Sequence, residues 1–290
     1  MPPLLSIIIA VYNDWTALNQ CLLSITQQAD STDFEVIVVD DGSSETFPER
    51  IRRWVDRLPL TIARQAHAGI STARNHGLQV SKGSILLFVD ADCRLRPDCL
   101  AALTSTIAGA PAHNCFQLRI VGDSRGIVGR AEDLRLITLQ NHLLQPNGCI
   151  RYLNTAGFAI RRSHVDIERG LFDSSALRAE DTLLLANLIQ RGELPLFASD
   201  AIIQHDIPLS LLQCLRKDVR SALLEGRAFD LIASKGIRIR MSNRERLGLL
   251  WSMWKASKQP SIGRPAWLAL TLRQSVQRMT SLIYPFRTKR

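Results

Sequence analysis

The sequence predicts an α/β fold in which a mainly parallel sheet is flanked by helices. Three apolar, β-branched runs, at residues 5–11, 34–39 and 85–89, are bounded by turn residues and are unbroken, as expected for strands buried on both faces. Segments with apolar residues at helical spacing, 15–28 and 71–80, lie between them. Because strands alternate with helices, the strands are expected to pair in parallel.

Shorter elements complete this pattern. A strand is expected near residues 60–63, and helices are expected near 49–55, 99–108, 131–144 and 180–190. From about Leu209 onward the chain reads as mostly helical, with interruptions at Gly236, Pro260 and Pro265. No repeat or low-complexity stretch interrupts the series, so the chain is expected to fold as an ordinary globular protein with a helical end.

The positive charge is concentrated in the last part of the chain. Of 290 residues with a net charge of +9, the first 234 carry 23 Lys and Arg against 26 Asp and Glu. Residues 235–290 carry 13 Lys and Arg against Glu245 alone. This distribution predicts an acidic globular part followed by a basic appendage that has a partner of its own.

The cysteines and the apolar runs bear on location. The six cysteines include no Cys-x-x-Cys pair, which favours reduced thiols in a cytoplasm. The first apolar run has no Lys or Arg before it and stops at Tyr12, so we interpret it as a buried strand rather than a signal peptide. No apolar stretch reaches the roughly 18 residues that suggest a spanning helix. We therefore expect a cytoplasmic protein, peripheral at the inner membrane face if it meets a membrane.

Two carboxylates follow directly on the third apolar run. Asp90 and Asp92 are separated by one residue, and ligand crevices of open parallel sheets lie beyond the carboxyl ends of the strands. Two such side chains are suited to Mg²⁺ or Mn²⁺, which take few protein carboxylates and complete their coordination with phosphate oxygens. The alternative is a plain acidic turn.

A second acidic turn ends the run 34–39. Asp40 and Asp41 precede Gly42 there, and both turns should lie on one edge of one sheet. Taken alone, such a turn is more commonly the N-cap of the next helix. Between the two turns lies the segment 69–77, which contains Arg74, and this combination is hard to attribute to chance.

These stretches together resemble the family 2 glycosyltransferases, which have the GT-A fold, a Rossmann-like α/β architecture. The resemblance covers about the first 215 residues. It implies a catalytic domain over 1–215, with a nucleotide-sugar-binding half (1–114) and an acceptor half (115–215), followed by a basic amphipathic helical region (216–290). The matching stretches are 6–13, 38–43, 71–77, 88–92, 154–162 and 170–181.

The resemblance assigns a donor site. It implies that Tyr12 packs on the nucleobase, that Asp41 hydrogen-bonds the edge of the base, and that Arg74 meets the base or a phosphate. Asp90 and Asp92 would contact ribose and metal, with Asp92 as the metal ligand. Ala10 is the sixth donor-binding candidate, and it stands where the family more often has Pro or another residue in contact with the nucleoside.

On the acceptor side the resemblance points to the pair Glu180 and Asp181. It makes Asp181 the general base of an inverting transfer, because a carboxylate opposite the leaving diphosphate must take the acceptor's hydroxyl proton. Without the resemblance, an acidic pair at a helix start is usually a dipole partner. His205 is a second candidate metal ligand, and a structural histidine is the alternative. Arg216, Lys217 and Arg220 could close over the diphosphate or form a solvated helix face.

The basic region carries two amphipathic stripes. Basic flanks and Trp side chains suit the interface of an anionic membrane. The alternative is that the stripes pack on the catalytic domain or on a second subunit. Nucleic acid is not expected as a partner, because no recognised nucleic-acid fold accompanies the charge. The stripes consist of Leu247, Leu250, Trp251 and Trp254, and of Leu268, Leu272, Val276, Met279 and Ile283.

Together these features predict a metal-dependent, inverting glycosyltransferase. Its donor would be a nucleotide-sugar, a UDP-sugar by preference, its cofactor Mn²⁺ or Mg²⁺, and its acceptor a glycan or a lipid-linked glycan. The rival enzyme is a nucleotidyltransferase, but such enzymes normally have a Gly-rich loop with Lys or Arg after the first strand, where this chain has residues 10–14. The rival outside enzymes is an inactive module that binds nucleotide-sugar.

Overall fold

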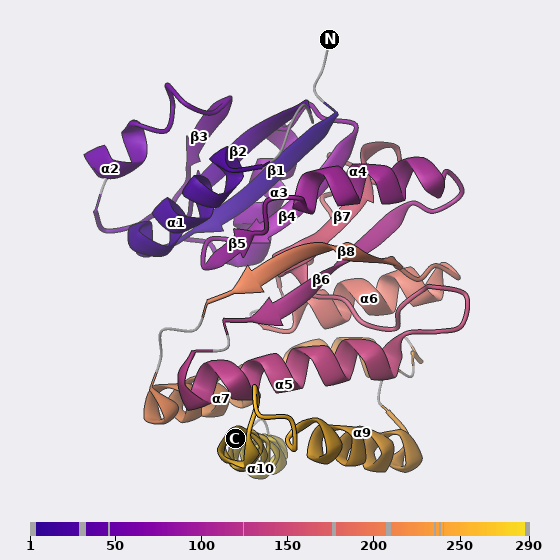
Figure 1. The fold of residues 1–290 in the computed structure, drawn as a ribbon. Coiled ribbons are helices and arrows are strands. Elements are labelled where there is room, and N and C mark those ends of the chain that lie inside the picture. Colours follow the sequence, from indigo (N-terminus) through magenta and orange to yellow (C-terminus); the bar gives the residue numbers. More distant parts are fainter. Residues whose placement is uncertain are drawn as a thin grey trace.

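The computed structural model describes residues 4–28, 33–45, 47–123, 125–175, 178–206, 210–234, 236–237, 239 and 241–287. In these residues, one eight-stranded sheet has the order β3-β2-β1-β4-β7-β6-β8-β5 and lies among helices (Figure 1), which confirms the predicted α/β class. The strands are β1 (Leu5–Val11), β2 (Phe34–Asp40), β3 (Leu60–Arg64), β4 (Ile85–Asp90), β5 (Cys93–Leu95), β6 (Cys115–Gly122), β7 (Phe158–Arg161) and β8 (Leu196–His205). The helices are α1 (Trp15–Thr26), α2 (Glu49–Arg52), α3 (Ile70–Val80), α4 (Cys99–Gly109), α5 (Gly126–Leu143), α6 (Glu180–Gln190), α7 (Leu211–Leu224), α8 (Gly226–Ser234), α9 (Asn243–Ala256) and α10 (Arg264–Arg287).

Helices cover both faces of the first half of the sheet. Ile7 and Ile9 of β1 pack in one buried cluster with side chains of α1 and α4. Ile8 packs in another cluster with side chains of α3 and α6. Successive side chains of a strand point to opposite faces, so β1 is apolar at every position except Ser6 because neither face meets water.

The strand directions divide the sheet in two. β3, β2, β1 and β4 all pair in parallel, as predicted. Beyond β4 the pairing is mixed, since β4 with β7, β7 with β6 and β8 with β5 are antiparallel, while β6 with β8 is parallel. The sequence pattern could not show this difference, because a strand buried on both faces is equally apolar in either direction.

The parallel half brings the acidic turns to one edge. Ala10 lies opposite Asp90 in the pairing of β1 with β4, and Val11 lies opposite Asp40 in the pairing of β1 with β2. The carboxyl ends of the three strands therefore meet at one level. This confirms that the two strand-end turns share one edge of the sheet.

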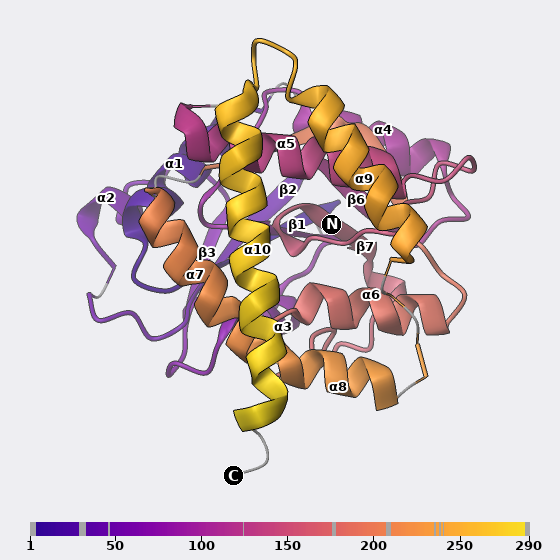
Figure 2. The ribbon, with the colours of Figure 1, turned by 90° about the horizontal axis from the view of Figure 1, so that it is seen from below.

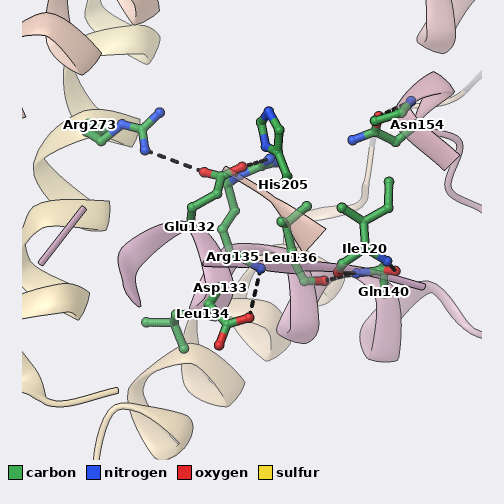
Figure 3. Close-up of polar contacts among 12 residues, drawn as sticks. Ile120, Glu132, Asp133, Leu134, Arg135, Leu136, Gln140, Asn154, His205 and Arg273 are labelled. Carbon is green, nitrogen blue, oxygen red and sulfur yellow. Dashed lines mark hydrogen bonds and ion pairs between the residues drawn. The ribbon is translucent and has the colours of Figure 1, made fainter. Parts of the chain in front are cut away.

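Side chains of α5 replace a missing strand beside β6. β7 pairs with β6 only as far as Gln117. Further along, Gln140 accepts a hydrogen bond from the backbone N–H of Ile120 at 3.0 Å and donates one to its carbonyl at 2.6 Å (Figure 3). Asp133 accepts from the backbone N–H of Gly122 at 3.0 Å. These bonds satisfy a buried strand edge and hold α5 at a set position against the sheet.

The C-terminal helices pack on α5 and α7. Figure 2 shows α9 and α10 in front of α5, with α7 beside α10, and side chains of α5, α9 and α10 form one buried cluster. Both helices therefore pack on α5, but through side chains other than those of the predicted stripes, most of which are exposed. Among the helices that the structure describes, none is both long and apolar enough to cross a membrane. The cluster consists of Ala131, Leu134, Leu249, Met253, Ile262, Ala266, Ala269 and Leu270.

Gly77 sets the distance between α3 and the sheet. A Cβ at this position would lie 2.5 Å from Cγ2 of Ile8 and 3.2 Å from Cγ2 of Val39, both in buried strands. We expect Gly77→Ala to lower the free energy of unfolding by about 1–3 kcal/mol through overpacking, although Ala is the better helix former. Urea unfolding measures this through the midpoint.

The matched control for this prediction is Gly109→Ala in α4. A Cβ at Gly109 would meet no atom within 4 Å. The control should therefore keep or gain stability, because only the helix preference acts. Equal stabilities of the Gly77 and Gly109 variants would contradict the close packing of α3.

Candidate active site

A cavity of about 700 Å³ lies at the carboxyl ends of the central strands. It is bordered by α5, by the start of α6, by α7, and by segments near α8 and α9. Six predicted site residues line it, whereas Ala10, Tyr12 and Asp41 lie outside its lining. The six are Arg74, Asp90, Asp92, Glu180, Asp181 and His205.

Tyr12 presents an exposed aromatic ring just after β1. Its ring stacks on that of His67, with centroids 4.1 Å apart and planes inclined by 22°. Half of Tyr12 remains exposed. The turn that carries it is held because Asn13, in the left-handed region at φ 56°, accepts hydrogen bonds from the backbone and hydroxyl of Ser44. A flat ligand could stack here against the open face of the ring.

Asp41 is buried and already has a full set of donors. One carboxylate oxygen accepts from the backbone of Ala68 at 2.9 Å and from the amide of Gln65 at 2.8 Å. The other accepts from the backbone of Gly69 at 2.9 Å and lies 2.9 Å from Nδ1 of His67. Since a carboxylate offers about four acceptor positions, a base that binds Asp41 must replace one of the two side chains. The sequence prediction named neither Gln65 nor His67.

Arg74 joins the end of β4 to the start of α6. Its guanidinium is 2% exposed and donates to Asp90 at 2.6 Å and to Glu180 at 2.9 Å. Burial alone would lower the pKa of Arg74, but the charges of Asp90 and Glu180 outweigh burial and raise it. The guanidinium also lies over the ring of Phe172, at 5.4 Å from its centroid. Arg74 therefore connects β4 to α6 through its ion pairs with Asp90 and Glu180.

Asp92, Cys93 and His205 form a group that could hold a cation. The antiparallel pairing of β5 with β8 sets Cys93 opposite His205, and Nε2 of His205 lies 3.3 Å from a carboxylate oxygen of Asp92. One ligand atom from each of the three lies within 4.8 Å of the others. Burial raises the pKa of the Cys93 thiol well above its usual value, so this thiol stays protonated. The oxygen and nitrogen that remain fit Mn²⁺ or Mg²⁺.

The charges of this group depend on each other. Burial alone would raise the pKa of Asp92, but the hydrogen bond and the charge of His205, with the charge of Lys217, lower it. Burial alone would lower the pKa of His205, but its hydrogen bond with Asp92 raises it. A cation that binds between them would replace the proton of His205, since a histidine ligand must be neutral.

Asp181 lies in the first turn of α6 and faces the cavity. Burial and then the charge of Glu180 raise the pKa of Asp181 to about 7, against a lowering by Arg74. The helix begins after Ala179, which has a φ of 61°. A carboxyl with a pKa near 7 is half ionised at neutral pH, which suits a group that must accept a proton.

An ionic cluster lies behind His205. Arg135 and Arg273 both pair with Glu132, and Arg273 also donates to Asp218 of α7 at 2.8 Å. Figure 3 shows Glu132 between the two arginines and close to His205. Burial alone would raise the pKa of Glu132, but Arg135 and then the other cations lower it to about 2. Helix α10 is thereby tied to α5 and α7 beside the candidate metal group.

Several basic residues line the cavity without having been predicted. Arg151, Arg178 and Arg246 come from segments far apart in the sequence, and among the described residues Arg178 and Arg246 form no ion pair. No local motif marks them, so only the fold reveals them. Of the three basic residues weighed on α7, Lys217 lines the cavity, whereas Arg216 and Arg220 are outside the lining.

Comparison with known sequences supports the resemblance. The family model described as "Glycosyl transferase family 2" matches residues 6–167. Glycosyltransferase AglE of Haloferax volcanii is 37% identical over 111 residues, 37% of this chain and 36% of AglE. Validoxylamine A glucosyltransferase of Streptomyces hygroscopicus subsp. jinggangensis is 34% identical over 114 residues, 38% of this chain and 27% of that protein. The chain thus matches only about a third of the length of these relatives.

Solved structures share the fold over nearly the whole chain. The mannosyltransferase PcManGT from Pyrobaculum calidifontis, in complex with GDP-Man and Mn²⁺, has a TM-score of 0.65 at 17% identity and covers 99% of this chain and 88% of its own. S. aureus TarS 1–349 in complex with UDP has a TM-score of 0.58 at 18% identity and covers 100% and 92%. At such identities the likeness shows the fold.

The raised pKa of Asp181 predicts a pH-dependent stability. In the unfolded chain this carboxyl ionises near its ordinary value of 3.8, whereas in the folded protein it ionises near 7. Its contribution to stability is therefore complete below about pH 4 and is lost as the pH rises through 7. We expect the wild type to lose more stability between pH 5 and pH 8 than Asp181→Asn, which stays neutral. Urea unfolding at both pH values measures the difference.

The exposed Asp200→Asn is the control and should lose as much as the wild type. A loss in Asp181→Asn as large as that of the wild type would show that Asp181 does not ionise near pH 7.

Proposed function

Because the chain belongs to glycosyl transferase family 2, we propose that it transfers one sugar from a nucleotide-sugar to a hydroxyl of a glycan or lipid-linked acceptor, with inversion. The donor is a UDP-sugar and the reaction depends on Mn²⁺ or Mg²⁺. The observation that carries this proposal is that one cavity joins Asp92 and His205 to Asp181, a carboxyl whose pKa is about 7.

The donor lies along the edge of the sheet, from Tyr12 to Asp92. The nucleobase stacks on Tyr12, whose ring is open to solvent, and its edge meets Asp41 after Gln65 or His67 moves aside. Asp90, at the end of β4, reaches the ribose, and Ala10 beside it leaves room for the nucleoside. Among proteins of similar fold, PcManGT is bound to GDP-Man and TarS to UDP. The purine donor is therefore the first alternative to test.

The residues beside the diphosphate neutralise its charge. Asp92 and His205 would hold the cation, and when bound it offsets the charge that builds on the departing diphosphate. Lys217 of α7 lines the same part of the cavity and adds a positive charge. Arg74 is paired with Asp90 and Glu180, so its guanidinium is not free to pair with the departing diphosphate.

Asp181 takes the proton of the attacking hydroxyl. It lies on the acceptor side of the cavity, where α8 and α9 contribute Phe229 and Arg246 to the lining. As the acceptor oxygen bonds to the anomeric carbon, the bond from that carbon to the diphosphate breaks on the opposite face, and the proton moves to Asp181. The neighbouring charge of Glu180 raises the basicity of Asp181.

A thermal-shift panel of UDP-, GDP- and dTDP-sugars, with and without Mn²⁺, tests the donor. A ligand at a hundredfold its Kd adds about 2.7 kcal/mol to stability, so we expect the largest shift with a UDP-sugar and Mn²⁺ together. Slow release of UDP from that donor, with water as acceptor, should accompany it. A shift without any nucleotide release would favour the inactive binding module, and no shift in the panel would overturn the donor assignment.

Asp92→Ala should abolish the metal-dependent part of UDP binding, because His205 alone cannot hold the cation against water. Isothermal titration with UDP and Mn²⁺ measures this. Asp98→Ala, an exposed carboxylate on the same segment, is the control and should bind as the wild type does. Unchanged affinity in Asp92→Ala would show that the cation binds elsewhere.

Asp181→Asn should lower turnover by roughly 10²–10⁴, as expected for the loss of a general base, and leave UDP affinity nearly intact. In the wild type, turnover should fall below about pH 7 as Asp181 becomes protonated. Initial rates of UDP release at several pH values test both statements. An Asn variant that stays active, or one that loses UDP binding as strongly as turnover, would remove Asp181 from the base role.

A further inference from the structure

The outer faces of α9 and α10 carry large apolar side chains that the fold leaves uncovered. The opposite faces of the same helices pack on α5 through the buried cluster described above. The uncovered side chains therefore lie on the surface of α9 and α10, the helices that Figure 2 shows in front of α5. They are Leu247 (68% exposed), Trp251 (55%), Trp254 (37%), Leu268 (60%), Leu272 (46%) and Met279 (68%). We call this set the outer face.

Positive charges surround the outer face. In residues 235–290 the one acidic side chain is Glu245, and it pairs with Arg151 of the cavity wall. The exposed basic residues of α9, α10 and the loop between them are Arg244, Arg246, Lys255, Lys258, Arg264 and Arg278. A second copy of the chain would bring like charges together here, whereas an anionic partner complements them.

The aromatic side chains of the outer face are arranged for an interface between water and hydrocarbon. Trp251 and Trp254 stack, with ring centroids 4.8 Å apart. The ammonium of Lys258 lies 3.8 Å from the centroid of Trp254, and that of Lys255 lies 5.6 Å from the centroid of Trp251. Each ring thus has an apolar body and a lysine ammonium over its face. Indole rings and basic side chains occur together where a protein rests on lipid headgroups.

We propose that the outer face binds an anionic lipid bilayer, with the apolar side chains inserted at the level of the headgroups and the basic side chains against lipid phosphates. Membrane binding does not require the transferase reaction. It adds to the proposed function, on which this part rests, the position of the cavity relative to the membrane. Arg246 of α9 and Phe229 of α8 line the acceptor end of the cavity. An acceptor anchored in lipid would therefore reach Asp181 from the side of the molecule that faces the membrane.

Flotation of the full chain with vesicles is the first test. Deleting α9 and α10 would expose their buried contacts with α5 and is not a clean variant. We expect the wild type to bind vesicles of phosphatidylcholine and phosphatidylglycerol, to ignore phosphatidylcholine alone, and to bind less as salt rises. Leu268→Glu with Leu272→Glu should weaken binding by at least about tenfold, since it places charge where apolar area is buried. Lys255→Glu with Lys258→Glu should also weaken vesicle binding, because it replaces positive charges that attract lipid phosphates with negative ones.

Val55→Glu is the matched control, because Val55 is an equally exposed apolar residue near α2, away from the outer face. It should bind vesicles as the wild type does. The thermal response to UDP and Mn²⁺ should be unchanged in all these variants, which separates failure of the membrane proposal from failure of the proposed function and shows that the variants are folded.

Quenching of Trp fluorescence by brominated lipids is the second test. Trp251 and Trp254 are exposed, Trp15 and Trp54 are buried in the core, and Trp267 of α10 is partly buried against the cluster with α5. We expect quenching in the wild type and clearly weaker quenching in Trp251→Phe with Trp254→Phe, a variant that keeps Trp267 and should still float. The proposal is overturned if the folded wild type ignores anionic vesicles, or if the Val55 control loses binding as the Leu variant does. It is also overturned if the protein self-associates and Leu268→Glu with Leu272→Glu abolishes that association.

Discussion

The buried guanidinium of Arg74 is the interaction on which the site depends. It forms ion pairs with Asp90 at the end of a strand and with Glu180 at the start of a helix, two groups that are distant in the chain. Without it, two carboxylates would be partly buried side by side with no partner, at a large cost in free energy. Because Asp181 follows Glu180 directly, the same tie sets the position of Asp181 and limits how far its pKa rises. The position and the pKa of Asp181 thus depend on Arg74, which is held by the neighbouring carboxylates.

The helical end of the chain contributes to this site from outside the region that the family match covers. Arg273 of α10 forms ion pairs with Glu132 and Asp218, and all three line a smaller cavity beside His205. Phe229 and Arg246 line the same cavity as Asp92 and Asp181. The helical end and the region that the family model matches therefore share one cavity, while the outer surface of α9 and α10 is uncovered.

The strand-end candidates can be found from the sequence because their signal is local. A carboxylate that follows an unbroken apolar strand must lie at the carboxyl edge of the sheet, so the amino-acid sequence alone places Asp90 and Asp92 there. Gln65 and His67, which complete the donors of Asp41, leave no such signal, since their role arises from a loop that folds back over the turn. Arg135 and Arg151 escape prediction for the same reason, because their positions depend on how α5 and the loop after it lie against the sheet.

The sequence by itself determined the class of fold, the order of the elements as far as β4 and the edge on which the carboxylates gather, because hydrophobic periodicity and strand ends are properties of short segments. Only the tertiary structure decided the antiparallel pairing beyond β4, the partners of Arg74 and the pKa of Asp181, because each depends on groups that are distant in the chain. It also decided which face of the basic helices is buried. The periodicity marked apolar stripes on them, but the Ala, Leu and Met side chains that pack on α5 lie on the other side. A helix with two apolar faces buries the face whose shape fits the neighbouring helix. The spacing of apolar residues along the sequence does not show which face that is.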